Sequence, residues 1–282
     1  MILPGTSALS FAMPRPGARR TARSLALMIG VWAAAPASAT PPPLLTNART
    51  EIASGEDLPS ALRTASARSE PGWVGWAVPI VAGQGDVCCF HRDGVRGCQL
   101  ERSSSGLLMN DSRSRSGSRE LVVLIRWQAS RPRVVRAADT GCSLDAGGSV
   151  VVWLEDVRPQ ASVKLLAEFA AAAGERSSDL ADGALAALAL HAGAEADSVL
   201  SALASAPHPR KLREDAIFWL GTARGRFGAD LLTRFARTET ADAILEKVAF
   251  ALAQSPVEEA GLVLAEMAKS HARPETRSHA LF

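Results

Sequence analysis

The sequence predicts an α+β protein in which a small, disulfide-stapled antiparallel β-rich domain at residues 40–157 precedes a helical array at residues 158–282. Runs of β-branched and aromatic residues, bounded by Gly, Pro, Asp and Ser, dominate the first of these regions. All four cysteines of the chain also lie there. After residue 157 the chain changes to alanine-rich segments whose apolar residues recur with the period of an α-helix.

Residues 1–39 have the pattern of a secretory signal peptide. An arginine-rich start precedes the uncharged run "SLALMIGVWAAA", and the small residues of "PASATPPP" place cleavage after Ala39. The apolar run is shorter than the roughly 20 residues that span a bilayer. Met13 is an alternative start. We therefore expect an exported protein, periplasmic or secreted, without stable membrane insertion after cleavage.

The charge of the chain excludes one class of partner. The formal net charge is +2, and the arginine-rich leader contributes much of it, so the mature chain is near neutral. Proteins that bind nucleic acid through the phosphate backbone are usually strongly basic. We expect no nucleic-acid partner.

The clustered cysteines predict disulfides. An exported chain with an even number of cysteines usually pairs them, and Cys88, Cys89, Cys98 and Cys142 allow three connectivities. A bridge between the two adjacent cysteines would strain the peptide that joins them. Neighbouring strand residues face opposite sides, so one of the two should pair locally across "HRDGVRG" and the other at long range. This favours Cys89–Cys98 with Cys88–Cys142 over the alternatives.

The first region reads as strands joined by short turns. The short connections favour hairpins and therefore an antiparallel sheet. Pro79 should lie on an edge strand or at a strand end, because proline cannot donate to a sheet ladder. The segment "DLPSALRTASAR" at 57–68 has helical spacing. The expected strands are 72–81, 86–90, 97–101, 120–128, 133–139 and 150–156.

Residues 101–120 interrupt the strands with "ERSSSGLLMNDSRSRSGSRE". Ser, Arg and Gly cannot bury a core, so this segment is predicted to be a long mobile hairpin loop. An alternative is a finger that binds a phosphorylated or acidic partner. It lacks the aromatic residues on which single-stranded nucleic acids stack. The solvated loop is the favoured interpretation.

In the second region two types of helix alternate, each with a step of 32 residues. The segment "LREDAIFWLG" at 212–221 returns as "ILEKVAFALA" at 244–253, and "TRSHALF" follows at the end of the chain. The step aligns Ala184, Ala216, Val248 and Ala280 in one column, Leu188, Leu220 and Leu252 in a second, and Leu203, Phe235 and Met267 in a third.

These motifs resemble the HEAT-repeat family in its short-repeat bacterial form. The resemblance rests on the two A-helix motifs, on Pro209 and Pro274 before A helices, and on the B-helix ends "RFA" and "EMA". The first region, with "WVGWAVP", "CC", "SLDAGG" and "VVWL", is similar to the leading domain of exported bacterial HEAT-repeat proteins. The resemblance implies an α-solenoid of stacked helical hairpins.

Stacked hairpins bury matching columns against one another. Phe218 should therefore pack toward Phe250 and, through the next repeat, toward Phe282. Trp219 is interpreted as core filling. Residues 274–282 lack both a polar cap and a partner helix, so we expect them to be frayed and the array to be cut short.

The sequence contains no recognisable catalytic motif. GxGxxG, the P-loop, HExxH, CxxC and GxSxG are all missing, and the five histidines fall in separate elements without metal-ligand spacing. His191 ends a helix, where a cation would stabilise the helix dipole. We therefore predict no catalytic residue, no cofactor and no metal ligand.

Two functions remain. The first is a non-enzymatic scaffold that binds a protein or peptide with its B helices, where Glu168, Ser201, Arg234 and Glu266 are the predicted partner-surface residues. The second is a thiol/disulfide redox enzyme that uses the vicinal pair Cys88-Cys89. A redox cysteine usually lies at a helix N-terminus, and this pair lies in a strand pattern instead. The scaffold is therefore the favoured prediction.

Overall fold

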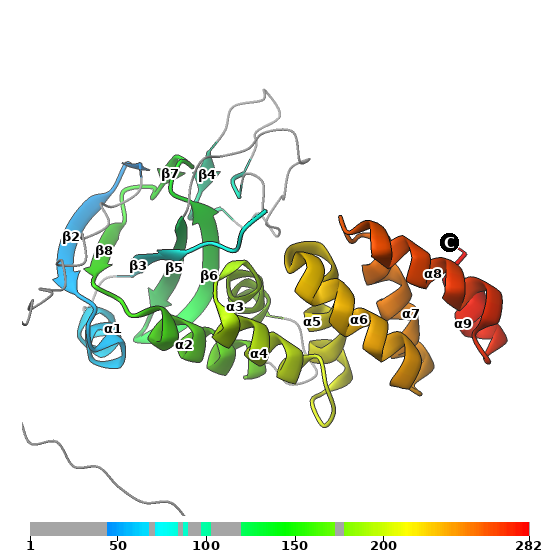
Figure 1. Ribbon diagram of the computed structural model, residues 1–282. Helices are drawn as coiled ribbons and strands as arrows, with labels where there is room; N and C mark the ends of the chain where they lie inside the picture. The colour runs from blue at the N-terminus through cyan, green and yellow to red at the C-terminus, as the bar shows by residue number, and fades with distance from the viewer. Residues whose placement is uncertain are drawn as a thin grey trace, which may run out of the picture. The chain divides into compact units, whose positions relative to one another are not determined.

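The computed structural model describes residues 44–67, 71–83, 87–89, 97–102, 120–172 and 178–281 (Figure 1). The predicted signal peptide, most of the segment 101–120 and Phe282 lie outside this part. The described residues contain both helices and strands, which confirms the α+β class. They all belong to one compact unit.

The main sheet has five strands in the order β2-β8-β3-β5-β6. The pairs β3/β5 and β5/β6 are antiparallel, as predicted. Pro79 is the last residue of β3, which is one of its two expected places. The strands are β2 (Arg49–Ser54), β3 (Gly72–Pro79), β5 (Glu120–Gln128), β6 (Arg131–Asp139) and β8 (Val150–Glu155).

The prediction of a purely antiparallel sheet is wrong, because β8 runs parallel to both of its neighbours, β2 and β3. Helix α1 (Leu58–Ser66) connects β2 to β3, and such a crossover brings the chain back in the same direction. The strand β8 fills the space between them. The sequence analysis missed β2 because "RTEIAS" is a polar edge strand whose largest apolar side chain, Ile52, is 61% exposed.

A second, smaller sheet has the order β1-β7-β4 and is parallel throughout. Its strands are β1 (Leu45–Thr46), β4 (Cys98–Gln99) and β7 (Leu144–Asp145). The expected strand 97–101 thus shrinks to two residues. Of the expected strand 86–90, the described residues 87–89 belong to no named strand. They are fixed instead by the hydrogen bond from the Val87 amide to Asp139 Oδ2, at 2.9 Å.

Eight helices follow β8 in the described part of the chain. The odd-numbered helices contact one another in the order α3, α5, α7, α9, and the even-numbered helices pack against them. The three columns defined by the step of 32 face the interior, where all their members but the half-buried Phe235 are buried. The helices are α2 (Pro159–Ala171), α3 (Asp179–Leu190), α4 (Ala194–Leu203), α5 (Arg210–Ala223), α6 (Gly225–Thr238), α7 (Asp242–Ala253), α8 (Glu258–Ser270) and α9 (Pro274–His279).

The end of the chain differs from the frayed segment that we expected. Residues Pro274–His279 form α9, which contacts α7 and α8. Thr276 is fully buried, and Ala280 occupies the same buried column as Ala216. The Arg277 guanidinium also donates a 2.7 Å hydrogen bond to the His271 carbonyl. Packing against two neighbouring helices therefore stabilises a helix that would be too short to form by itself.

The helices and the sheet share one hydrophobic core. Trp76 of β3 donates a 3.0 Å hydrogen bond from Nε1 to Ser162 Oγ of α2, and both side chains are buried. Helix α3 packs on β6 so closely that a Cβ at Gly183 would lie 2.2 Å from the Val135 carbonyl oxygen. The predicted boundary at residues 157 and 158 coincides with the change from strand to helix, but the core continues across it.

The contact between α3 and β6 generates a test of the fold. Gly183→Ala should destabilise the protein by about 1–3 kcal/mol, because the new methyl group overlaps a backbone oxygen that cannot rotate away. Gly261→Ala is the matched control: it also lies in a helix, has no atom within 4 Å of an added Cβ, and should stabilise by about 0.5–1 kcal/mol. Denaturant unfolding measures both changes. Equal stability of the two variants would contradict the close packing.

Candidate functional site

A cavity of about 580 Å³ lies beside β6, the edge strand of the main sheet. Ligand sites commonly have volumes of about 300–1,000 Å³. Apolar side chains form most of its lining, among them Leu124 and Val135 of the sheet, Leu185 of α3, and Trp219 of α5. Because successive strand residues face opposite sides, the cavity receives side chains from both faces of the sheet at this edge.

Two aromatic rings of α5 form one wall of the cavity. Phe218 and Trp219 meet edge to face, with ring centroids 5.3 Å apart. Trp219 is half-buried and borders the cavity, so it only partly serves the core-filling role that the sequence suggested. The interior of the helix layer is filled by Ala216 and Leu220 instead.

The two described phenylalanines of the column are not buried in the core, since Phe218 is half-buried and Phe250 is exposed. Phe218 stacks on Phe250 of α7 with centroids 6.3 Å apart, as expected, but Phe250 is 47% exposed. Lys247 Nζ lies 5.2 Å from the centroid of the Phe250 ring. The third member, Phe282, lies outside the described residues. The period of 32 residues therefore correctly predicted the contact between Phe218 and Phe250, but the prediction that this contact is buried is wrong.

Charged side chains also border the cavity. Lys211 and Asp215, one turn apart on α5, form an ion pair. Asp179 and Asp182 are exposed on the first turn of α3, where the dipole of the helix favours carboxylates. Arg136 of β6 is half-buried.

Of the two cations that border the cavity in the described part of the chain, Lys211 is paired with Asp215 and Arg136 has no bonded partner. Within the described part of the chain its side chain makes no hydrogen bond or ion pair at contact distance. Burial lowers the pKa of Arg136, and the field of Asp179 only partly offsets this effect. The sequence gives no signal for Arg136, because the two arginines in "RVVRAAD" look like ordinary polar positions of a strand.

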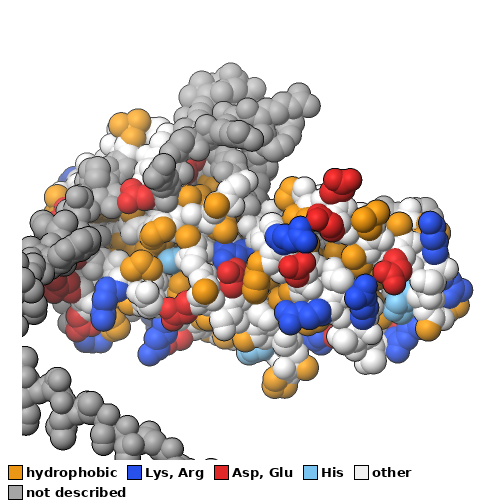
Figure 2. Space-filling model, viewed as in Figure 1, with side chains coloured by type: hydrophobic (Ala, Val, Ile, Leu, Met, Phe, Trp, Pro, Cys, Tyr) orange, Lys and Arg blue, Asp and Glu red, His pale blue; other side chains and the backbone are white. Residues whose placement is uncertain are grey.

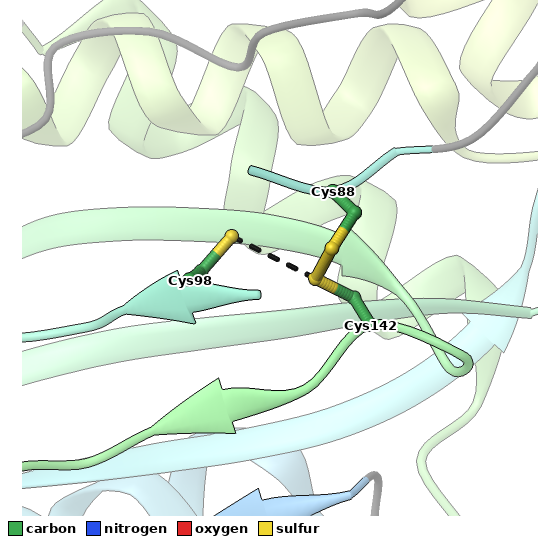
Figure 3. A group of neighbouring side chains, drawn as sticks. All are labelled: Cys88, Cys98 and Cys142. Atoms are coloured by element: carbon green, nitrogen blue, oxygen red, sulfur yellow. Dashed lines mark hydrogen bonds between the residues drawn. A yellow bond between two sulfur atoms is a disulfide. The ribbon is translucent and has the colours of Figure 1, made fainter. Parts of the chain in front are cut away.

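Both disulfides connect the pairs that the sequence favoured, Cys88–Cys142 and Cys89–Cys98. Cys88 and Cys142 are buried, whereas Cys89 and Cys98 line the cavity. The two bridges touch, with Cys98 Sγ 3.7 Å from Cys142 Sγ (Figure 3). Three sulfur atoms therefore cluster here, but metal coordination needs thiolates, and none of the described cysteines is free.

Cys88 and Cys89 are not bonded to each other. Each is tied to a different partner, so the vicinal pair does not form a disulfide of its own in this structure. Neither residue lies in a helix. The pair consequently lacks the helix N-terminus that lowers a cysteine pKa in many redox sites.

His191 is the C-cap residue of α3, as the sequence predicts, but its lowered pKa disfavours the cationic form that the expected interaction with the helix dipole needs. Its side chain is fully buried, its Nδ1 lies 2.9 Å from the Ala192 carbonyl oxygen, and within the described residues its Nε2 has no partner. Burial lowers the pKa of His191; Arg224 adds to this effect, and the contact with Ala192 opposes it. The lowered pKa therefore favours the neutral imidazole at pH 7.

Arg224 supplies the positive charge at this helix end. It is buried, pairs with Asp197 of α4, and donates hydrogen bonds to the carbonyl oxygens of Ala189, at 3.0 Å, and His191, at 2.7 Å. A cation that binds the last carbonyls of α3 compensates the negative end of the helix dipole. The same side chain ties the end of α3 to α4 and to the junction of α5 with α6.

The four predicted partner-surface residues lie on the even-numbered helices. Glu168 of α2, Arg234 of α6 and Glu266 of α8 are exposed, and Ser201 of α4 is half-buried. None of them borders the cavity. Figure 2 shows acidic, basic and apolar side chains interspersed over the helices, without a continuous patch of one charge on this face. The role of these four residues stays a prediction.

Comparison of the chain with protein-family models, with curated proteins and with solved structures gave no match. Among the described residues, no helix combines the length and the apolar character that crossing a bilayer requires. The functional argument therefore rests on the geometry of this chain alone.

The buried histidine predicts a dependence of stability on pH. An ordinary histidine has a pKa of 6.5, and that of folded His191 is lower, so the unfolded chain binds a proton more readily than the folded one. His191 should therefore cost no stability above pH 6.5 and an increasing amount as the pH falls from there toward its lowered pKa. Thermal unfolding between pH 8 and pH 5 measures the effect. His191→Gln should flatten this part of the profile, and an unchanged slope would contradict the assignment.

The difference in burial between the disulfides predicts the order in which they are reduced. Under native conditions a phosphine reductant should open Cys89–Cys98, which lines the cavity, before the buried Cys88–Cys142. Stepwise alkylation and mass spectrometry of the peptides report the order. In denaturant, where both bridges are accessible, the difference should vanish. Earlier alkylation of Cys142 in the native protein would contradict the expected order.

Proposed function

We propose that the chain is a non-enzymatic scaffold that binds a protein or peptide partner in the periplasm or outside the cell. In this proposal the helices α2–α9 are a HEAT-like α-solenoid. Two features support the architecture: the columns at steps of 32 residues are buried, and the helices pack in two alternating layers. Stacked helical repeats present extended surfaces that commonly bind other proteins.

The observation that carries the proposal is the exposed aromatic column on the odd-numbered helices. Phe250 keeps 47% of its surface exposed although it stacks on Phe218. The Lys247 ammonium lies over the ring, 5.2 Å from its centroid. Exposed aromatic residues that are held rigid by their neighbours are typical of the centres of protein interfaces, because they lose little entropy on binding.

The two disulfides support the proposed location. Disulfides persist in oxidising compartments such as the periplasm and the extracellular space. This agrees with a leader of the type that the first 39 residues resemble. The redox alternative receives less support, since each of the four cysteines is already paired and the vicinal pair belongs to two bridges.

We place the proposed interface on the odd-numbered helices, where Phe250 is exposed, and a pair of variants distinguishes it from the predicted interface on the even-numbered helices. A photo-crosslinking amino acid at position 250 in the native host should capture the partner, which is then purified for affinity measurements. Phe250→Glu should weaken its binding by about tenfold or more, as the loss of an aromatic anchor does. Leu262→Glu is the control, because Leu262 is also an exposed apolar residue, at 69%, but lies on α8.

Replacement of Glu168, Ser201, Arg234 and Glu266 together by alanine tests the other face. We expect this variant to bind like the unmodified protein. If it loses binding while Phe250→Glu does not, the even-numbered helices form the interface. If neither variant changes binding of the captured protein, the scaffold proposal is wrong for the helical region.

A further inference from the structure

We propose that the cavity beside β6 binds a small amphipathic anion, an apolar chain or ring system that ends in a carboxylate. This site adjoins the protein-binding surface of the preceding proposal, because Phe218 lines the cavity and also stacks on Phe250. Phe250, which carries that proposal, does not border the cavity. The inference rests on three features of the described residues: the apolar walls, an unsatisfied arginine, and the way in which the other charges are distributed.

The walls suit an apolar body. Leu124, Val135 and Leu185 approach from the sheet and from α3, and the edge-to-face pair of Phe218 and Trp219 closes the side of α5. The volume of about 580 Å³ is in the range of sites that take small organic ligands. Burying the body of such a ligand supplies free energy in proportion to the apolar area removed from water.

Arg136 supplies a binding group for a carboxylate. A guanidinium carries five N–H donors in a planar fork that matches the two oxygens of a carboxylate. In the described part of the chain no acceptor is bonded to this fork, although the side chain is half-buried. A half-buried cation without a bonded partner gains more from an anionic ligand than an exposed one, because water compensates it less.

The carboxylates around the cavity oppose an anion only weakly. Asp215 is paired with Lys211. Asp179 and Asp182 are exposed on the first turn of α3, where water and salt screen their charge. Arg136 is shielded more from solvent than these two residues, so its charge dominates inside the apolar space.

A series of three probes with one chain length tests the charge preference. Dodecanoate, dodecanol and dodecyltrimethylammonium share an apolar chain and differ in the charge of the head group. They are titrated at pH 7.5, each below its micelle concentration, by displacement of a neutral naphthylamine dye. We expect dodecanoate to bind about tenfold or more tightly than dodecanol, because it adds a charge-assisted hydrogen bond, and the ammonium to bind most weakly.

Three variants assign the preference to residues. Arg136→Gln should abolish the advantage of dodecanoate over dodecanol and leave the affinity for dodecanol unchanged. Arg133→Gln is the matched control, since Arg133 lies exposed on the same strand and does not border the cavity. Trp219→Ala should weaken both ligands by a similar factor. If Arg136→Gln fails to fold, Arg136→Lys replaces it, and should reduce the advantage of dodecanoate because a lysine cannot bind both oxygens.

Several results would overturn the proposal. Equal binding of dodecanoate and dodecanol would show that the cavity does not prefer an anion. Tighter binding of the ammonium would show that it prefers cations. If no probe binds, the cavity is not a ligand site. A shift of equal size in Arg133→Gln would show that the preference comes from net charge and not from Arg136.

An N-acetylated apolar tripeptide, compared with its C-terminal amide, tests whether the carboxylate belongs to a peptide terminus. Tighter binding of the free acid than of dodecanoate would identify a peptide terminus as the ligand instead of a small molecule.

Discussion

The packing of α3 on β6 is the contact on which the rest of the structure depends. Gly183 lets the helix approach until only a hydrogen atom fits between its backbone and the Val135 carbonyl. This contact joins the core of the sheet to the core of the helices. The next odd-numbered helix, α5, packs on α3 and brings Trp219 to the edge of the sheet. The cavity exists because α3 and α5 flank β6.

Two buried polar contacts hold this arrangement from the sides. The hydrogen bond between Trp76 and Ser162 fixes α2 on the sheet, and Arg224 fixes the far end of α3 to the helices that follow. Buried polar groups are costly without partners, so each contact disfavours alternative packings in which its donor would be left unsatisfied. The lowered pKa of His191 depends on the same environment, because burial and the nearby Arg224 both disfavour the charged imidazole.

The main sheet ends in the edge strand β6, which α3 covers in part. An edge strand such as β6 offers unpaired backbone groups to other chains, and proteins commonly cover such edges. Here α3 packs against β6, while the cavity remains beside it with Arg136 at its margin. A charged side chain directed along an edge also discourages pairing with another strand. The same residue can thus protect the edge and recognise an anion.

The sequence by itself determined the local and periodic features. The step of 32 residues identified the buried column of Ala184 and Ala216, because this column follows from the geometry of one helix. The opposite orientation of adjacent side chains favoured the pairing of Cys88 with Cys142, although the expected strand around these cysteines does not form. Only the tertiary structure decided the position of β8, the exposure of Phe250 and the role of Arg136. These properties depend on which segments meet in space. A strand does not specify its neighbours through its own period, and a helix column reaches the surface or the core according to what packs against it.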